Sequence, residues 1–445
     1  MGRRMGFLVW TPPMKTLPFL VTALAVLLSP SLEAEDARPP NVLVIVSDDH
    51  AWYDYGFMGS KDVRTPHIDR LAAESRAFPR GYVVNSLCGP SLAALLTGKH
   101  PHRNGITGND PVLPPAAKGK SKYAHPSFQQ GREKMTSLWE KNPHIPRLLE
   151  PKGYVSLQTG KWWLGDYRRG GFTEGMTKGG RHGDDGLDIG RKTLAPVTDF
   201  ISKAKRDQKP FFVWYAPMMP HDPHTPPERL LAKYVDKTPS LHQARYWAMV
   251  EWFDETVGEI RDHIEKEGLS KDTVVIYIAD NGWIQSQNNS RYAPRSKQSP
   301  HEGGVRTPIL VSWPGRVKPG SVNRAVSEVD IMPTLLRLCG LPVPAGVEGI
   351  DLLDDAAVAA RGEVFGSNYT HDILELGRPA ASLRYRWVVA GEWKAIFSSG
   401  INGANEPPQL FNLKDDPREL RDLAVSDPDR VAGLKAKVDA WWDGR

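Results

Sequence analysis

Four short apolar segments, each followed at once by polar residues, constrain the fold of this chain more than any other feature. They are residues 41–47 before Asp48-Asp49-His50, residues 273–279 before Asp280-Asn281-Gly282, residues 211–216 before Pro220-His221-Asp222, and residues 154–159 before Gly160-Lys161. Their apolar residues are continuous rather than alternating, which is typical of parallel strands buried on both faces. Because ligands of open α/β sheets bind beyond the carboxyl ends of the strands, we expect the four ends to converge on one cleft.

The segments between these strands indicate the fold class. Residues 68–77 and 246–267 have helical patterns that fit crossover connections. We therefore predict an α/β domain with a large, mixed, mostly parallel sheet flanked by helices. Two segments rich in Gly, Pro, Lys and His, residues 107–136 and 167–191, are expected to be long loops that cover the cleft or stay mobile.

The pattern changes after about Pro344. Residues 384–389 and 393–397 flank Gly391 like antiparallel strands. The apolar residues of 431–441 have spacings of three and four, which suits one helix lying on that sheet. We expect a catalytic domain over residues 35–345 and a C-terminal subdomain, a small antiparallel sheet plus a helix, over residues 346–445.

Composition excludes several classes of protein. The 57 Lys and Arg residues are scattered among 52 Asp and Glu residues and form no basic block, so we expect no nucleic-acid partner. Two cysteines in 445 residues exclude a disulfide scaffold. Cys339 ends an apolar run and is expected to be a small core residue.

The first 34 residues are similar to a secretory signal peptide. Arg3 and Arg4 give a charged start, residues 17–28 are mostly apolar, and residues 31–34 offer a small-residue cleavage site. Twelve apolar residues are too few to cross a hydrocarbon core of ~30 Å as a helix, so we expect no stable membrane span. The protein is therefore expected to be exported to the periplasm or the extracellular space.

Asp48, Asp49, Asp280 and Asn281 offer hard oxygen donors from two strand ends. Such donors are the ligands that Ca²⁺ or Mg²⁺ prefers. Each pair alone is better explained as a solvated turn than as a metal site, and the first pair also as a helix N-cap. The presence of both pairs after buried strands favours a divalent metal site.

Cys88 precedes a predicted helix. Pro90 suits the first turn of that helix and Gly98 suits its end. A cysteine at this position lies at the positive end of the helix dipole, which stabilises a thiolate or a bound oxyanion. The alternative is a buried structural cysteine.

Taken together, these residues resemble those of the formylglycine-dependent sulfatases, which are arylsulfatase-like members of the alkaline phosphatase superfamily. The matching stretches are residues 41–49, 65–71 and 88–98, Gly160-Lys161-Trp162, Pro220-His221, Asp280-Asn281-Gly282, Lys297 and residues 302–308. Residues 410–413 with Asp416, Pro417 and Glu419 also resemble the C-terminal subdomain of that family.

The resemblance implies a mechanism. A maturing enzyme, such as a formylglycine-generating enzyme, would oxidise Cys88 to formylglycine, and one hydroxyl of the hydrated aldehyde would attack the sulfate sulfur. The other hydroxyl would then expel sulfate as the aldehyde reforms. The resemblance places one Ca²⁺ ion on Asp48, Asp49, Asp280 and Asn281. It assigns Lys161, His221 and Lys297 to binding the sulfate or protonating the departing oxygen.

Two positions depart from the family pattern. Leu92 stands where an Arg is usual, and Trp163 stands where a His usually follows Gly-Lys-Trp. Each lost group would hydrogen-bond the nucleophile, and such bonds to charged groups are worth roughly 1.5–3 kcal/mol. Arg181, His182 and His301 are candidate substitutes, and nothing in the sequence selects among them.

We therefore expect a sulfatase that hydrolyses a small-molecule or glycan sulfate ester, with a carbohydrate as the favoured substrate. Two alternatives stay open. One is a phosphoester hydrolase of the same superfamily, and the other is a catalytically impaired binder of sulfated glycans.

Overall fold

The computed structural model describes residues 1–3, 5–13, 38–113 and 122–445. It contains two units, Met1–Arg38 and Pro39–Arg445. The described residues of the first unit form no helix or strand, and the apolar run 17–28 of the predicted signal peptide lies outside the described residues. No helix in the described part of the chain is long and apolar enough to cross a membrane. The second unit is described below.

A nine-stranded sheet forms the centre of this unit. Its order is β10 (Val326–Ser327), β2 (Arg76–Tyr82), β8 (Arg306–Ser312), β7 (Thr273–Ala279), β1 (Asn41–Ser47), β6 (Phe211–Ala216), β4 (Val155–Gly160) and β5 (Glu174–Gly175), with β9 (Gly320–Ser321) beside β2. Strands β7, β1, β6, β4 and β5 pair in parallel, whereas β8 is antiparallel to both β7 and β2. The predicted mixed, mostly parallel sheet is confirmed.

Both faces of the sheet are buried, which explains the continuous apolar segments. In β1, Val42, Val44 and Val46 face one core, while Leu43 and Ile45 face the other. Because side chains alternate along a strand, one continuous apolar segment contributes side chains to both cores.

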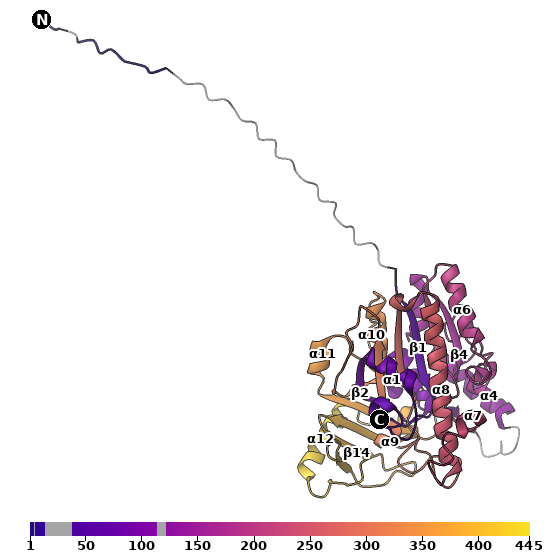
Figure 1. Cartoon of the computed structure of the whole chain (residues 1–445). Coiled ribbons are helices and arrows are strands. Elements are labelled where there is room, and N and C mark those ends of the chain that lie inside the picture. Colours follow the sequence, from indigo (N-terminus) through magenta and orange to yellow (C-terminus); the bar gives the residue numbers. More distant parts are fainter. Residues whose placement is uncertain (4, 14–37, 114–121) are drawn as a thin grey trace. The chain divides into compact units, whose positions relative to one another are not determined.

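Helices cover the two faces. The face of Leu43 is covered by α1 (Pro66–Ala73), α6 (Ala195–Arg206) and α8 (Leu241–Lys266). The other face is covered by α2 (Cys88–Thr97), α4 (Pro126–Trp139), α5 (Ile145–Leu149) and α10 (Ile331–Leu338). Figure 1 shows α8 lying along the strands. The shorter helices are α3 (Pro101–Asn104), α7 (Glu228–Leu231), α9 (Glu302–Val305) and α11 (Asp355–Ala360).

The C-terminal region forms the predicted second sheet. Its antiparallel order is β11 (Glu363–Tyr369), β13 (Leu383–Ala390), β14 (Trp393–Ser398) and β15 (Gln409–Asn412), and α12 (Pro428–Trp441) packs on it. Figure 1 shows these elements in orange and yellow. A two-stranded pair, β3 (Asp110–Pro111) with β12 (Asp372–Ile373), joins the segment after α3 to this region. Trp387 and Ile396 of the second sheet pack in the core of the first, so one continuous core joins the two sheets.

Two expectations for local structure were wrong. The predicted loop 107–136 contains most of helix α4, and the predicted helix 68–77 ends at Ala73 and gives way to β2. The predicted loop 167–191 contains only the short strand β5 and a 3₁₀ segment, Arg181–Asp188.

Candidate active site

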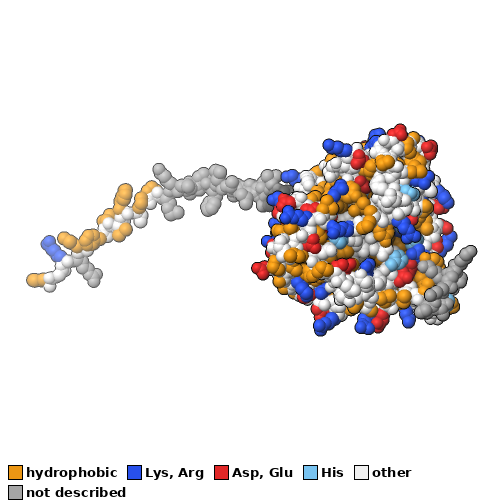
Figure 2. Space-filling view, turned by 90° about the horizontal axis from the view of Figure 1, so that it is seen from below, with side chains coloured by type: hydrophobic (Ala, Val, Ile, Leu, Met, Phe, Trp, Pro, Cys, Tyr) orange, Lys and Arg blue, Asp and Glu red, His pale blue; other side chains and the backbone are white. Residues whose placement is uncertain are grey.

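The carboxyl ends of four strands deliver the polar residues to one place. Strand β1 leads to Asp48 and Asp49, β7 to Asp280 and Asn281, β4 to Lys161, and β6 to His221, while α2 begins with Cys88 and the segment after β7 carries Lys297. Figure 2 shows the molecule from below, with Lys, Arg and His side chains exposed among acidic and hydrophobic ones. The structure therefore brings together all eight residues singled out in the sequence.

Cys88 lies at the centre of the group and is only 1% exposed. Its Sγ atom lies 3.4 Å from Asn281 Oδ1 and 3.7 Å from Asp48 Oδ1. The ammonium groups of Lys297 and Lys161 lie 3.4 Å and 3.9 Å from the same sulfur. A group built on this side chain is therefore surrounded by two cations and by oxygen donors.

Each lysine also pairs with a carboxylate. Lys161 Nζ lies 2.9 Å from Asp48 Oδ2, and Lys297 Nζ donates to both oxygens of Asp49 at 2.6 and 2.8 Å. These buried pairs raise the pKa of both lysines despite the opposing effect of burial. Both side chains are therefore ammonium ions at neutral pH.

His221 reaches the same group from β6. Its Nε2 atom lies 3.4 Å from Asp49 Oδ2, and its Nδ1 atom lies 2.9 Å from Asp222 Oδ1. The imidazole is partly exposed, unlike the lysines, so it lies where the cleft opens. A group in this position can exchange a proton with a bound molecule.

The oxygen donors fit a hard divalent cation. Oxygens of Asp48, Asp49 and Asp280 and the sulfur of Cys88 lie within 4.8 Å of one another. The buried Oδ2 atom of Asp280 has no hydrogen-bond partner among the described residues. Burial and the neighbouring carboxylates raise the pKa of Asp280 well above its usual value, so this carboxylate needs a further positive charge to stay ionised.

The structure modifies the expectation for the Cys88 thiol. The cysteine does begin helix α2, and Gly98 ends that helix in the left-handed conformation. Burial and the charge of Asp280, however, raise the pKa of the thiol well above its usual value, and they outweigh the two lysines. The unmodified side chain is therefore a neutral thiol, which is a poor nucleophile.

The two departures from the family pattern lie in apolar surroundings. Leu92 and Trp163 are buried in the same core cluster as Cys88. The ring of Trp163 lies 4.8 Å from Lys161 Nζ and 4.8 Å from the ring of His182. An imidazole thus lies beside the position from which the family histidine is missing.

The structure separates the three candidate substitutes. The His301 side chain hydrogen-bonds to Ser299 and Gln409 and to none of the eight residues around Cys88. Arg181 is bound by Asp110, with its Nε and Nη2 both 2.8 Å from Oδ2, and its Nη1 lies 3.3 Å from His182 Nδ1. Because arginine only donates, Nδ1 of His182 accepts and its proton lies on Nε2.

Packing on β4 holds His182 in place. Gly183, with a φ of 109°, lies so close to Gly160 that a Cβ atom would be 2.1 Å from the Gly160 carbonyl oxygen. His182 itself has a φ of 68°, an uncommon conformation for a residue with a side chain. Burial, helped by the charge of Lys161, lowers the pKa of His182 far below its usual value, so its imidazole is neutral.

Several residues of the site were not found from the sequence. Asn109 Oδ1 accepts from the Gly89 N–H at 2.7 Å, and Glu328 accepts from the Ser91 hydroxyl at 2.6 Å. Trp283 lies 5.7 Å from Lys297 Nζ and contacts His221. Only Trp283 had a sequence signal, because it directly follows Asp280-Asn281-Gly282.

Comparisons with known proteins identify the family of this chain. Residues 40–341 match the sulfatase family model, and residues 295–439 match the model of the C-terminal part of N-sulphoglucosamine sulphohydrolase. Human N-acetylgalactosamine-6-sulfatase is 30% identical over 87% of this chain and 82% of its own length. Human arylsulfatase A is 28% identical over 90% of this chain and 87% of its own length.

Solved structures share the fold. The structure of Ps i-CgsB in complex with a neocarrahexaose covers 92% of this chain and 94% of its own, with a TM-score of 0.71 and 24% identity. At this identity the likeness shows the fold alone. The match of the family model over residues 40–341 shows more, namely that this chain belongs to the sulfatase family of sulfuric ester hydrolases.

Proposed function

We propose that this sulfatase hydrolyses sulfate esters of carbohydrates, with residue 88 converted to formylglycine and with one Ca²⁺ ion. The observation that carries the proposal is the position of Cys88, between two buried lysines and beside the oxygens of Asp48 and Asn281. The two cations and the oxygen donors around this side chain suit an anionic reaction centre.

Each part of the site has a role in this proposal. Formylglycine supplies a hydrated aldehyde whose hydroxyl is the nucleophile, and Ca²⁺ on the four strand-end ligands supplies electrostatic stabilisation. Lys161 and Lys297 bind oxygens of the sulfate group from two sides of residue 88. His221, at the open side of the cleft, protonates the departing alcohol oxygen. His182 donates from Nε2 in place of the missing family histidine.

The charge of the site favours sulfate over phosphate. Three carboxylates, two lysines and one divalent ion leave a single positive charge. A sulfate monoester carries one negative charge and a phosphate monoester carries nearly two at neutral pH. The site therefore suits the sulfate ester better.

The carbohydrate part of the proposal is supported by the relatives. The names of the curated relatives include an N-acetylgalactosamine-6-sulfatase and an ulvan-active sulfatase. One neighbouring structure holds D-glucosamine-2-N,6-O-disulfate. Export through the predicted signal peptide and conversion of Cys88 by a maturing enzyme belong to the same proposal.

Kinetics with matched aryl esters test the reaction. Protein matured in its native host should hydrolyse 4-nitrophenyl sulfate with a higher kcat/KM than 4-nitrophenyl phosphate. Cys88→Ala should abolish turnover, while Cys339→Ala should retain it because Cys339 is buried at the end of α10, outside the cleft. Faster hydrolysis of the phosphate ester would instead identify a phosphoester hydrolase, and an active Cys88→Ala variant would refute the nucleophile.

A further inference from the structure

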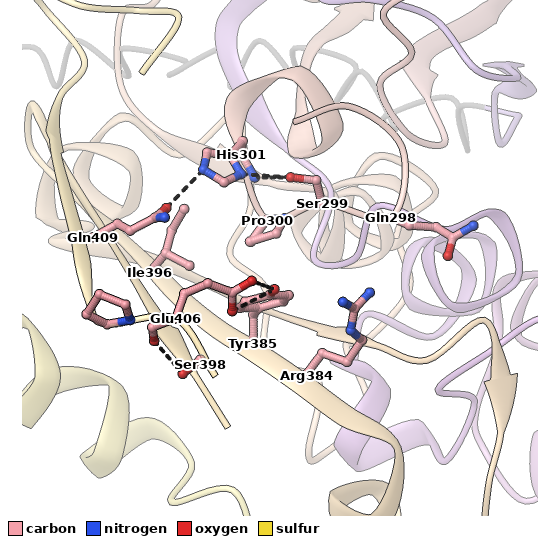
Figure 3. Close-up of a pocket in the computed structure, with 11 residues that line it drawn as sticks. Gln298, Ser299, Pro300, His301, Arg384, Tyr385, Ile396, Ser398, Glu406 and Gln409 are labelled. Atoms are coloured by element: carbon pink, nitrogen blue, oxygen red, sulfur yellow. Dashed lines mark hydrogen bonds between the residues drawn. The ribbon is translucent and has the colours of Figure 1, made fainter. Parts of the chain in front are cut away.

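A pocket of about 180 Å³ lies between the segment that follows Lys297 and the C-terminal sheet. Residues 298–301 form one wall, and Arg384, Tyr385 and Gln409 form part of the other. Figure 3 shows Arg384 directed toward the space between Pro300 and Gln298. The pocket is therefore built jointly by the two sheets.

Hydrogen bonds tie both walls to the residues that flank Cys88. The backbone N–H of Gln298, which directly follows Lys297, donates to the Ser86 carbonyl at 2.9 Å. The opposite wall is joined through the Thr370 N–H, which donates to Ser382, and through His371, whose carbonyl accepts from the Asn109 N–H. Asn109 in turn accepts from the N–H of the residue after Cys88. Both walls of the pocket are thus bonded to segments that carry residues of the active site.

Arg384 forms no ion pair with a described residue in this pocket. Its buried Nε atom has no hydrogen-bond partner among the described residues, and its guanidinium interacts with the Tyr385 hydroxyl. Its guanidinium lies 5.4 Å from the centre of the Tyr385 ring. The carboxylate of the pocket, Glu406, already accepts from the Tyr385 hydroxyl at 3.0 and 3.1 Å.

Among the residues that line the pocket, Glu406 is the one carboxylate, and it is bonded to the Tyr385 hydroxyl rather than ion-paired with Arg384. His301 is bonded to Ser299 and Gln409, and burial, with the charge of Lys394, lowers its pKa to about 3. The imidazole of His301 is therefore neutral. An arginine held beside an anion-binding active site and lacking a carboxylate of its own is suited to a planar or tetrahedral oxyanion.

We propose that Arg384 binds a second anionic substituent of the substrate, a carboxylate or a further sulfate, while the scissile sulfate occupies the site at residue 88. This inference rests on the proposed function and narrows its substrate class to glycans with at least two anionic groups. Arg384 is then a specificity-determining residue supplied by the C-terminal sheet.

Substrates that differ by one anion test the proposal. Arg384→Ala should lower kcat/KM about 10- to 100-fold for a substrate with a second anion and leave 4-nitrophenyl sulfate within about twofold. The paired probes are N-acetylgalactosamine 6-sulfate against its 4,6-disulfate, and a 6-sulfated, uronate-containing disaccharide against its carboxyl-reduced form. The first pair reports on a second sulfate and the second pair on a carboxylate.

Binding measured without turnover separates this inference from the proposed function. On a Cys88→Ala background, calorimetry should show tighter binding of the doubly anionic probe of at least one pair, and Arg384→Ala should remove that preference. Arg384→Lys should keep part of it, and it replaces the alanine variant if that variant fails to fold. Arg378→Ala, on an exposed arginine paired with Glu375, should change nothing. Equal affinity for both members of each pair, or an equal loss for both in Arg384→Ala, would overturn the proposal.

Discussion

At the scale of single residues, the site is a balance of buried charges. Asp48 and Asp49 each hold a lysine, whereas Asp280 has no cation within ion-pair distance among the described residues. This difference singles out Asp280 as the ligand whose ionisation depends most on a metal. It also makes Asp280 the best position at which to test for one.

Metal removal should therefore affect the wild type and Asp280→Asn differently. A chelator should lower the Tm of the wild type, because an ion that binds only the folded state stabilises it, and should lower activity by about 100-fold or more. Asp280→Asn should contain no metal, so a chelator should not change its Tm further. The variant also lacks the repulsion of Asp280 by the carboxylates of Asp48 and Asp49. Thermal melting and elemental analysis measure both. Asp185→Asn, at an exposed carboxylate, is the control and should behave as wild type. An active, metal-free wild type would contradict the assignment.

His182 should be the substitute for the missing family histidine. His182→Ala should lower kcat for 4-nitrophenyl sulfate roughly 10- to 100-fold, because a neutral donor near the nucleophile is lost. Arg181→Ala should have a smaller effect, since Arg181 only orients the imidazole, and His301→Ala should leave the rate near that of wild type. Steady-state kinetics of the three variants decide the order. A larger loss in His301→Ala would show that the assignment is wrong.

The sequence indicated which residues lie together at the site better than it indicated their protonation states and contacts. Polar residues after buried strands are visible in the sequence, because the strand ends of a parallel sheet share one edge. The choice among Arg181, His182 and His301 was not visible, because it depends on the packing of Gly183 against Gly160. The neutral state of the Cys88 thiol likewise follows from burial, which no local pattern shows.

At the scale of elements, a buried ion cluster joins the two sheets. Lys394 of β14 is fully buried and lies 3.0 Å from Glu302 in α9 and 3.1 Å from Glu419. Glu302 and Glu419 both belong to stretches that resemble the sulfatases, and here they bind the same lysine. These residues therefore act in the assembly of the two sheets rather than in the reaction.

Removing the lysine should destabilise the protein strongly. Lys394→Met leaves the buried Glu419 without a cation and leaves Glu302 only Arg306, at 3.7 Å. Breaking a buried ion pair in this way costs about 3–5 kcal/mol. Thermal melting should show a lower Tm, with part of the loss restored in Lys394→Met/Glu419→Gln. Lys414→Met, in an exposed pair with Glu392, is the control. A Tm unchanged by Lys394→Met would refute the role of the cluster.

The same cluster should make stability depend on pH. Burial raises the pKa of Glu419 to about 7, against the effect of Lys394. A carboxyl group with a raised pKa contributes its full stability below its unfolded value of 4.5, and this contribution is lost as the pH rises through about 7. Glu419→Gln should therefore flatten the Tm profile between pH 4.5 and 7. A profile as steep as that of wild type would show that another group titrates.

Two elements were missed for identifiable reasons. The Gly, Pro, Lys and His content of residues 107–136 suggested a loop, yet α4 begins within this segment. A Cβ atom at Gly131 would lie 2.4 Å from Pro111, so the glycine allows close packing of α4 on β3. Strand β2 contains Arg76, Pro79 and Gly81, which hide its pattern, and its register shifts between Phe78 and Gly81. In both cases tertiary packing outweighs local propensity.

At the scale of the whole molecule, the two sheets contribute different residues. Ends of four main-sheet strands supply the residues around Cys88, and the C-terminal sheet supplies Arg384 and the lysine that fixes the interface. The domain boundary near residue 345 remains a prediction, since one core is continuous across both sheets. Folding also closes the site, because Cys88 is almost fully buried in the finished structure. We expect conversion of this residue to precede completion of the fold.

The most direct test of the account is the chemical identity of residue 88 in protein purified from its native host. Mass spectrometry of the tryptic peptide that contains residue 88 should show the mass of formylglycine, and the peptide that contains Cys339 should show an unmodified cysteine as an internal control. Formylglycine at position 88 in active protein is the predicted result. Active protein whose peptide carries only a cysteine thiol at position 88 would contradict the account.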